Sequence, residues 1–319
     1  MIDFRYHLVS IVAVFLALAL GIILGSTTLS QSVTKGLQRQ TAQLAKSNEE
    51  HRRTGTKLRT QVEGDENFAR TLGPQIVADR LKGQSLIFVE TPGASNASIE
   101  QLSELAKNAG AAVTGRVTIQ KKFLDDDQTS TVDELAGQLK PADMTFPSGA
   151  GSYDKAGAVL ASALVTKDAA KTGREDGAAA SILAGFRQAG YVTTSGKPGQ
   201  HATLAVMIAP SSPYASEGGD TDNKALLSLA AALDGANSGT VLGGPSTAVQ
   251  EGGLVAALRD SDIDKSVSSQ DTVDTASGQV ATLLALQNEM SGKVGHYGTG
   301  SGVSGYLPSP PPPAAGGNG

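Results

Sequence analysis

The sequence predicts an α/β protein made of an N-terminal transmembrane helix, a coiled-coil stalk and a Rossmann-like three-layer domain with a mostly parallel sheet. Three observations support this fold class. An uncharged apolar run occupies Leu8–Gly25, a long stretch without proline follows it, and short apolar runs alternate with amphipathic helical patterns beyond residue 84. Such alternation is typical of parallel strands covered by helices on both faces.

The apolar run is long enough to cross a bilayer. Its 18 residues would form a helix of roughly 27 Å, close to the hydrocarbon core of about 30 Å. A cleaved signal peptide and a buried soluble helix are the two other interpretations. The small pair Ala17 and Ala19 lies inside the run, where signal cleavage would not occur. The sequence therefore favours an uncleaved transmembrane signal anchor over residues 1–28.

The orientation of the anchor follows from its flanks. Arg5 precedes the run, and Lys35 and Arg39 follow it, so the bias of positive charge is weak. A very short N-terminal flank usually stays in the cytoplasm while the large C-terminal part is exported. We therefore expect a single-pass protein of the cell membrane, with a cytoplasmic N-terminus and an extracytoplasmic domain.

Composition excludes several classes of site. The chain has 319 residues, no cysteine and a formal net charge of −5. Without cysteine there are no disulfides, iron–sulfur clusters or thiolate metal sites. A net negative chain without a basic cluster is not expected to bind nucleic acid. No cofactor is predicted.

Residues 29–66 are predicted to form a coiled-coil stalk. Two sets of positions recur every seven residues and alternate at spacings of four and three, which is the a/d pattern of coiled coils. Asn48 falls at an a-like position, where a polar residue fixes a dimer and its register. The alternative is an amphipathic helix that folds back on its own domain. The predicted partner-binding face, for another copy or for a different protein, comprises Leu37, Thr41, Leu44, Asn48, His51, Leu58 and Val62.

The stalk is expected to end at Gly64–Glu66, and a helical hinge is predicted over residues 67–83. A second helical piece, Phe68–Leu81, should be interrupted at Gly73-Pro74, because a residue before proline disfavours the helical conformation. The exported α/β domain then spans residues 84–307. The Pro/Gly-rich tail, residues 308–319, is predicted to be disordered.

Within the domain the expected elements alternate. Strands are predicted over residues 85–90, 112–119, 203–209 and 239–242, with a weaker candidate over 265–268. Helices are predicted over residues 98–109, 153–165, 178–189, 224–233, 252–259 and 276–290.

The loops that follow the strands carry weak signals for nucleotide binding. Thr91-Pro92-Gly93 lacks the glycines of the dinucleotide fingerprint. The Gly243–Thr247 loop has backbone N–H groups to offer an anion, although Pro245 removes one donor. A formal G-x-G-x-x-G starts at Gly300, but no predicted strand precedes it. It is interpreted as a chance match in a flexible segment.

No catalytic set emerges. The sequence has no Walker motif, no G-x-S-x-G elbow and no H-E-x-x-H, and its four histidines are far apart. Asp125–Asp127 is interpreted as the solvated start of a helix rather than a cation site. The protein is therefore not expected to be an enzyme.

Both ends of the chain resemble one family. The opening Arg5–Ser10 runs into Val14–Ser26, and Val273–Ala276 is followed by Gly295–Gly298. These segments are similar to the actinobacterial copper transporter family, MctB, up to about Leu307. The resemblance implies copper efflux through a mycolic-acid envelope, with association with the outer membrane as one outcome. Other members similar to SteB are implied to be anchored coiled-coil proteins that work with a SteA-like membrane partner on a septal peptidoglycan hydrolase.

Residue chemistry decides between these two implied roles. Copper(I) prefers Cys, clustered Met or paired His, whereas the four methionines are dispersed and only Met290, His296 and Tyr297 lie near one another in sequence. One helix does not make a pore. We therefore expect a non-catalytic, membrane-anchored assembly or regulatory factor of cell division and cell-wall hydrolase control. A component of copper transport is the alternative, resting on the family resemblance alone, and no metal site is assigned.

Overall fold

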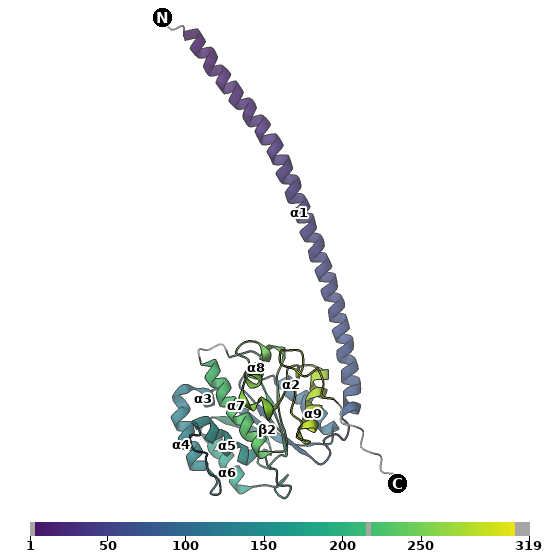
Figure 1. Cartoon of the computed structure of the whole chain (residues 1–319), viewed down its shortest axis with the longest axis vertical. Helices are drawn as coiled ribbons and strands as arrows, with labels where there is room; N and C mark the ends of the chain where they lie inside the picture. The colour runs from purple at the N-terminus through teal and green to yellow at the C-terminus, as the bar shows by residue number, and fades with distance from the viewer. Residues whose placement is uncertain (1–3, 215–217, 310–319) are drawn as a thin grey trace. The chain divides into compact units, whose positions relative to one another are not determined.

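A computed structural model describes residues 4–214 and 218–309 of the chain. The chain divides into two units, Met1–Asp65 and Glu66–Gly319. The helix α1, Phe4–Val77, begins in the first unit and ends in the second (Figure 1). Phe4–Gly25, with a mean hydropathy of 2.9 and no buried residue, is long and apolar enough to cross a membrane.

Helix α1 corrects two predictions about the stalk. It has no break at Gly64–Glu66 and it continues through Pro74 to Val77, so the predicted interruptions are wrong. A helical glycine costs only about 1 kcal/mol relative to alanine, which the flanking helix-forming residues offset. Pro74 removes one helical hydrogen bond. The turn is nevertheless held, because Val77 is fully buried in the core of the second unit.

The second unit is built on one seven-stranded sheet in the order β3-β2-β1-β4-β5-β6-β7. Every neighbouring pair is parallel except β2 and β3, which are antiparallel. The predicted α/β class with a mostly parallel sheet is thus confirmed. The strands are β1 (Ser85–Glu90), β2 (Ala112–Ile119), β3 (Val192–Gly196), β4 (Leu204–Ile208), β5 (Thr240–Gly243), β6 (Ser268–Gln270) and β7 (His296–Tyr297).

Helices cover both faces of the sheet (Figure 1). They are α2 (Asn96–Asn108), α3 (Lys121–Leu124), α4 (Thr129–Leu139), α5 (Ser152–Leu164), α6 (Gly177–Gln188), α7 (Gly219–Ala236), α8 (Leu254–Arg259) and α9 (Ala276–Glu289). Alternate residues of a strand point to opposite faces. Accordingly, Ile87 and Val89 of β1 join the core beneath α4–α8, whereas Leu86 and Phe88 join the core beneath α2, α9 and the end of α1.

The elements differ from the prediction mainly at the polar parts of the sheet. β1 and β2 have the predicted bounds, but the weak strand expected at residues 265–268 is displaced to Ser268–Gln270, because a 3-10 turn occupies Asp262–Lys265. The strands β3 and β7 and the helices α3 and α4 were not predicted. Asp126–Gln128 form a short 3-10 turn directly before α4, so the acidic run does lie at a helix start. The predicted tail lies almost wholly outside the described residues.

Candidate functional site

The predicted partner-binding face lies along one side of α1. A repeat of seven residues brings its members onto a single stripe of the helix. Leu37, Leu44, Leu58 and Val62 expose 58, 68, 56 and 59% of their surface. The polar members Thr41, Asn48 and His51 are exposed as well. We call these seven residues the stalk seam.

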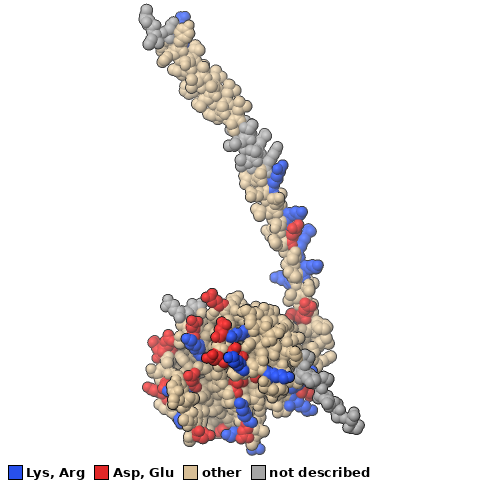
Figure 2. Space-filling model, viewed as in Figure 1, with Lys and Arg blue, Asp and Glu red and all other residues tan. Residues whose placement is uncertain are grey.

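Charged side chains beside the stalk seam pair with one another along α1. Glu49 accepts hydrogen bonds from Nε of Arg52 and Nε of Arg53, each at 2.9 Å, and Lys46 lies 4.0 Å from Glu50. The bonds from Arg52 and then Arg53 lower the pKa of the Glu49 carboxyl. Figure 2 shows Lys and Arg side chains in blue along the helix. The seam is therefore a row of apolar and polar uncharged side chains. Some of the charged side chains beside it are already paired with one another.

In the domain, the loops at the place where open α/β sheets usually bind ligands are hydrogen-bonded to one another. Ligands normally bind beyond the carboxyl ends of the strands where the strand order reverses, here between β1 and β4. Thr91 Oγ1 donates to the carbonyl of Ile208 at 2.8 Å, and the amide of Ser211 donates to Gly93 at 2.9 Å. The Tyr214 hydroxyl donates to the carbonyl of Pro92 at 3.0 Å. Burial raises the pKa of Tyr214, which keeps the phenol protonated in this position.

The Gly243–Thr247 loop uses its backbone groups within the domain. The amide of Gly244 donates to the carbonyl of Gln270 at 2.8 Å, and the carbonyl of Gly244 accepts from Val273 at 3.0 Å. A Cβ atom on Gly244 would lie 2.7 Å from the Cβ atom of Ala248. This glycine therefore serves close packing between β5 and the following turn.

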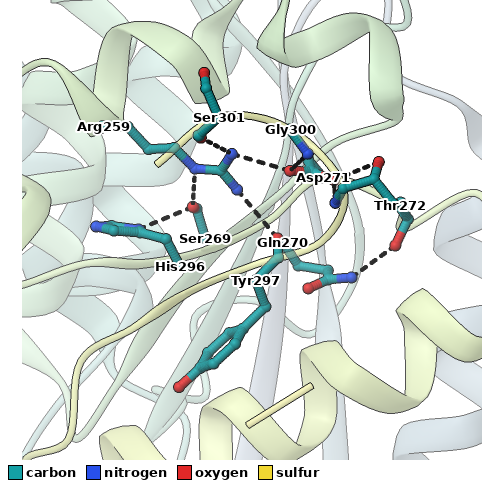
Figure 3. A network of polar contacts seen from close by, with 10 residues as sticks. Arg259, Ser269, Gln270, Asp271, Thr272, His296, Tyr297, Gly300 and Ser301 are labelled. Atoms are coloured by element: carbon teal, nitrogen blue, oxygen red, sulfur yellow. Dashed lines mark hydrogen bonds and ion pairs between the residues drawn. The ribbon is translucent and has the colours of Figure 1, made fainter. Parts of the chain in front are cut away.

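A buried polar network lies where β6 and β7 end (Figure 3). Nη1 of Arg259 is 2.9 Å from Oδ2 of Asp271, and their side chains are 6 and 0% exposed. Arg259 also donates to Oγ of Ser269 at 3.0 Å and to the carbonyl of Tyr297 at 3.0 Å. The Asp271 carboxylate accepts from the amides of Thr299 at 2.7 Å and Gly300 at 3.0 Å.

This network corrects the prediction for the glycine-rich segment. Gly300 belongs to an ordered loop held by Asp271, and Gly298 has a φ of 127°. A side chain on Gly298 would meet the Asp271 carboxylate. The glycines let the backbone wrap a buried carboxylate, so the segment is ordered and the expected flexibility is wrong. Sequence reasoning missed Arg259 and Asp271 because neither stands in a recognisable motif.

The histidines and methionines are distributed over separate environments. Nε2 of His201 lies 3.0 Å from Oδ2 of Asp176, while Nδ1 of His296 lies 2.9 Å from Oγ of Ser269. Burial, followed by the nearby Arg259 charge, lowers the pKa of His296. Met290 packs against the core beneath α2 and α9. In residues 4–214 and 218–309, no three His, Cys, Asp or Glu side chains gather as a metal site would require.

A groove of about 510 Å³ is formed by the C-terminal part of α1, α2 and α9. Gly73 allows α1 to approach α9, since a Cβ atom there would lie 2.9 Å from Cγ2 of Val280. Gln101 and Gln279 join its walls through a 2.9 Å hydrogen bond. No sequence signal pointed to this groove, because its walls are far apart in the chain.

Comparison with known proteins gives one consistent result. A family model described as "Copper transport outer membrane protein, MctB" matches residues 1–308. Proteins named "Copper transporter MctB" from Mycobacterium tuberculosis and Mycobacterium bovis are 29% identical over 308 residues, covering 95% of this chain and 98% of theirs. The protein of that name from Mycobacterium leprae is 28% identical over 315 residues, with the same coverage. Since the match extends from the apolar helix to the loop around Asp271, the chain belongs to the MctB family.

Proposed function

We propose that this protein is a membrane-anchored component of copper transport at the cell envelope, acting by assembly with a partner. The observation that carries the proposal is the family match over residues 1–308. The description of that family names copper transport and the outer membrane. The curated relatives are named copper transporters. Copper is here the cargo, and no residue of this chain is assigned as its ligand.

Assembly is proposed because the stalk seam has no partner among the described residues. Leu44 and Leu58 are more than half exposed. Burying a leucine contributes roughly 1.5–3 kcal/mol, so several exposed leucines on one stripe favour association. A coiled coil, formed with a second copy or with another membrane protein, would bury them.

A non-catalytic role forms part of the proposal. The hydrogen bonds of Thr91, Ser211 and Tyr214 join the loops at the crevice where related folds bind nucleotides. The Gly243–Thr247 loop is likewise engaged in the domain's own packing. Single substitutions in that loop that leave the fold intact should therefore leave the biological activity intact.

We further propose that Phe4–Gly25 spans the membrane once, with the N-terminus in the cytoplasm and the α/β domain outside. A labelling experiment tests this orientation. The chain has no cysteine, so a single Lys293→Cys variant can be labelled selectively in intact cells. Labelling by a membrane-impermeant maleimide is expected, and labelling only after lysis would reverse the orientation.

A deletion strain tests the copper proposal. Loss of the protein should raise cell-associated copper and sensitivity to copper, and the full chain should restore both. A Leu44→Asp/Leu58→Asp variant should fail to restore them. An Arg39→Asp/Arg53→Asp variant, which changes the same helix away from the seam, should succeed. Normal copper content and resistance in the deletion strain would overturn the proposal.

Regulation of cell-wall hydrolysis during division is the second candidate function, and the exposed seam favours it also. In that role the seam would bind a SteA-like membrane protein or a hydrolase. The deletion strain would then show separation or shape defects in medium without added copper. Restoration of normal separation by the Arg39→Asp/Arg53→Asp variant, but not by the seam variant, would support this role over copper transport.

A further inference from the structure

The outer edge of β3 is an open strand edge. β3 stands at one end of the sheet and pairs with β2 alone. At the opposite end, the outer side of β7 is bridged by the chain itself, from Tyr297 to Gly305. Natural sheets usually protect such an edge with charge, proline or a bulge. The sequence of β3, VTTSG, contains no charge and no proline.

The register shows which backbone groups face outward. The amide of Gln120 donates to Tyr191, and the amide of Lys197 donates to Thr114, so odd-numbered residues of β3 bond toward β2. In an antiparallel ladder the groups of alternate residues point to opposite sides. The N–H and C=O groups of Val192 and Thr194 therefore point away from the sheet, whereas Gly196, with a φ of 72°, departs from the extended conformation. Within residues 4–214 and 218–309, no hydrogen bond reaches them.

A groove of about 270 Å³ lies beside this edge, with α6 as its other wall. Ala180 and the largely buried Leu183 line this wall. The two ends of the groove differ in charge. Glu175 and Asp176 precede α6, and Arg187 lies in its last turn. Arg187 makes no ion pair with any described residue, while Glu175 is paired only with exposed Lys197 at 3.7 Å.

We propose that β3 and α6 form an interface with a second copy of this chain, in which the two β3 strands pair antiparallel about Thr194. This register places Val192 opposite Gly196 of the second copy and Thr194 opposite its own counterpart. The outward backbone groups of Thr194 are then hydrogen-bonded to those of its counterpart, and the two sheets become continuous there. Cross-strand threonine pairs are favourable in such ladders.

Charge supports a second copy over an unrelated strand. In the antiparallel arrangement the start of one α6 lies beside the end of the other. Glu175 of each copy is then opposite Arg187 of its neighbour, so both ends of the groove become complementary at once. A second copy of the chain therefore matches this edge in its backbone hydrogen-bonding pattern and in the charges at the two ends of the groove.

Cysteine cross-linking tests the register directly. The natural chain has no cysteine, so every disulfide comes from the introduced residue. Opposed residues of a hydrogen-bonded pair have Cα atoms about 5.5 Å apart, which suits a disulfide. The full-length Thr194→Cys protein, reconstituted in nanodiscs and mildly oxidised, should give a covalent dimer. Ser291→Cys, at an exposed site beyond α9, is the control for chance collision and should not cross-link.

A charge swap tests the orientation. Glu175→Arg and Arg187→Glu, each in the Thr194→Cys background, should lower the yield of dimer by about fivefold. Each single change removes two exposed ion pairs from the dimer, because the two-fold axis makes every contact between the copies occur twice. The double variant should restore the yield. Cross-linking of Thr194→Cys no greater than that of Ser291→Cys, failure of the double variant to recover, or cross-linking in cells to a different protein would each overturn the proposal.

Discussion

Arg259 and Asp271 form an ion pair at 2.9 Å in which both side chains are almost completely buried. The guanidinium also donates to Ser269 and Tyr297, and the carboxylate accepts from the amides of Thr299 and Gly300. The pair thus joins α8, β6 and the loop that follows β7. Both charged groups are buried and hydrogen-bonded on all sides. Removing either residue alone would therefore leave the other with an unpaired charge in the interior.

Removing one member of this pair should therefore strongly destabilise the domain. We expect Arg259→Met to lower the free energy of unfolding by roughly 3–5 kcal/mol, because Asp271 would keep an unpaired buried charge. Urea unfolding followed by circular dichroism measures the change. The Arg259→Met/Asp271→Asn double variant should be less destabilised than the sum of the two single changes. Lys107→Met, which removes an exposed pair with Glu104, should change the free energy by less than about 1 kcal/mol.

Two glycines of α1 should respond oppositely to alanine. At Gly73 the new methyl group would lie 2.9 Å from Cγ2 of Val280, and overpacking of this kind costs roughly 1–3 kcal/mol. At Gly64 a methyl group meets nothing within 4 Å, so alanine should stabilise the helix by roughly 0.5–1 kcal/mol. Thermal unfolding of the two variants measures both effects. Adding Val280→Ala should relieve the cost of Gly73→Ala, and a double-mutant cycle without coupling would contradict the close approach.

The stability of the domain should depend on pH through Glu289. Burial raises the pKa of Glu289 from 4.5 to about 7, and its Oε1 accepts the amide of Ser268 at 2.9 Å. Between pH 4.5 and about 7 the folded state keeps the proton that the unfolded state has lost. The free energy of unfolding therefore falls as pH rises through this window. Asp234, whose pKa burial raises to about 6, acts in the same direction.

Glu289→Gln isolates this contribution from that of His296, whose lowered pKa acts in the opposite direction. The variant should be more stable than the natural protein at about pH 8, and the difference should shrink toward about pH 5. Urea unfolding at several pH values gives both curves. Parallel curves would show that Glu289 does not titrate differently in the two states.

Asn48 should control the specificity of the stalk seam more than its strength. Replacing a buried asparagine at an a position by isoleucine strengthens a coiled coil but relaxes its register and oligomeric state. We expect Asn48→Ile to associate more tightly than the natural chain and to give more than one species in sedimentation velocity. Gln43→Ile, on the same helix outside the seam, is the matched control. A single species of unchanged affinity for Asn48→Ile would place Asn48 outside the interface.

The sequence predicted the fold best where burial imposes an apolar pattern. β1 and β2 combine apolar runs with clear turn residues, and both have the predicted bounds. β3 was missed because its Thr193–Gly196 portion is polar, as befits a strand with one open edge. The sequence of α4 does carry a helical signal, since Val132, Leu135, Ala136 and Leu139 recur at helical spacing, directly after the acidic run.

The candidate sites were less predictable, for a physical reason. The stalk seam is a local repeat, so its residues share a helix face by periodicity alone. Its binding role remains a prediction. The network around Asp271 is assembled from groups that lie 12 to 29 residues away, and spacing in the chain gives no hint of them. The sequence predicted breaks in α1 because Gly64 and Pro74 disfavour a helix locally. The burial of Val77, which holds the last turns, depends on tertiary packing and is not visible in the sequence.

The loop around Asp271 also sets when the domain can finish folding during synthesis. Thr299 and Gly300, which complete the carboxylate's hydrogen bonds, and Tyr306, which bonds to Ser277 at 2.7 Å, are among the last described residues of the chain. Until they leave the ribosome, Asp271 lacks two of its donors and β6 lacks its neighbour β7. The nascent domain thus stays open until the segment that ends at Tyr306 has been synthesised, and a chain truncated before Gly298 would remain a substrate for chaperones and proteases.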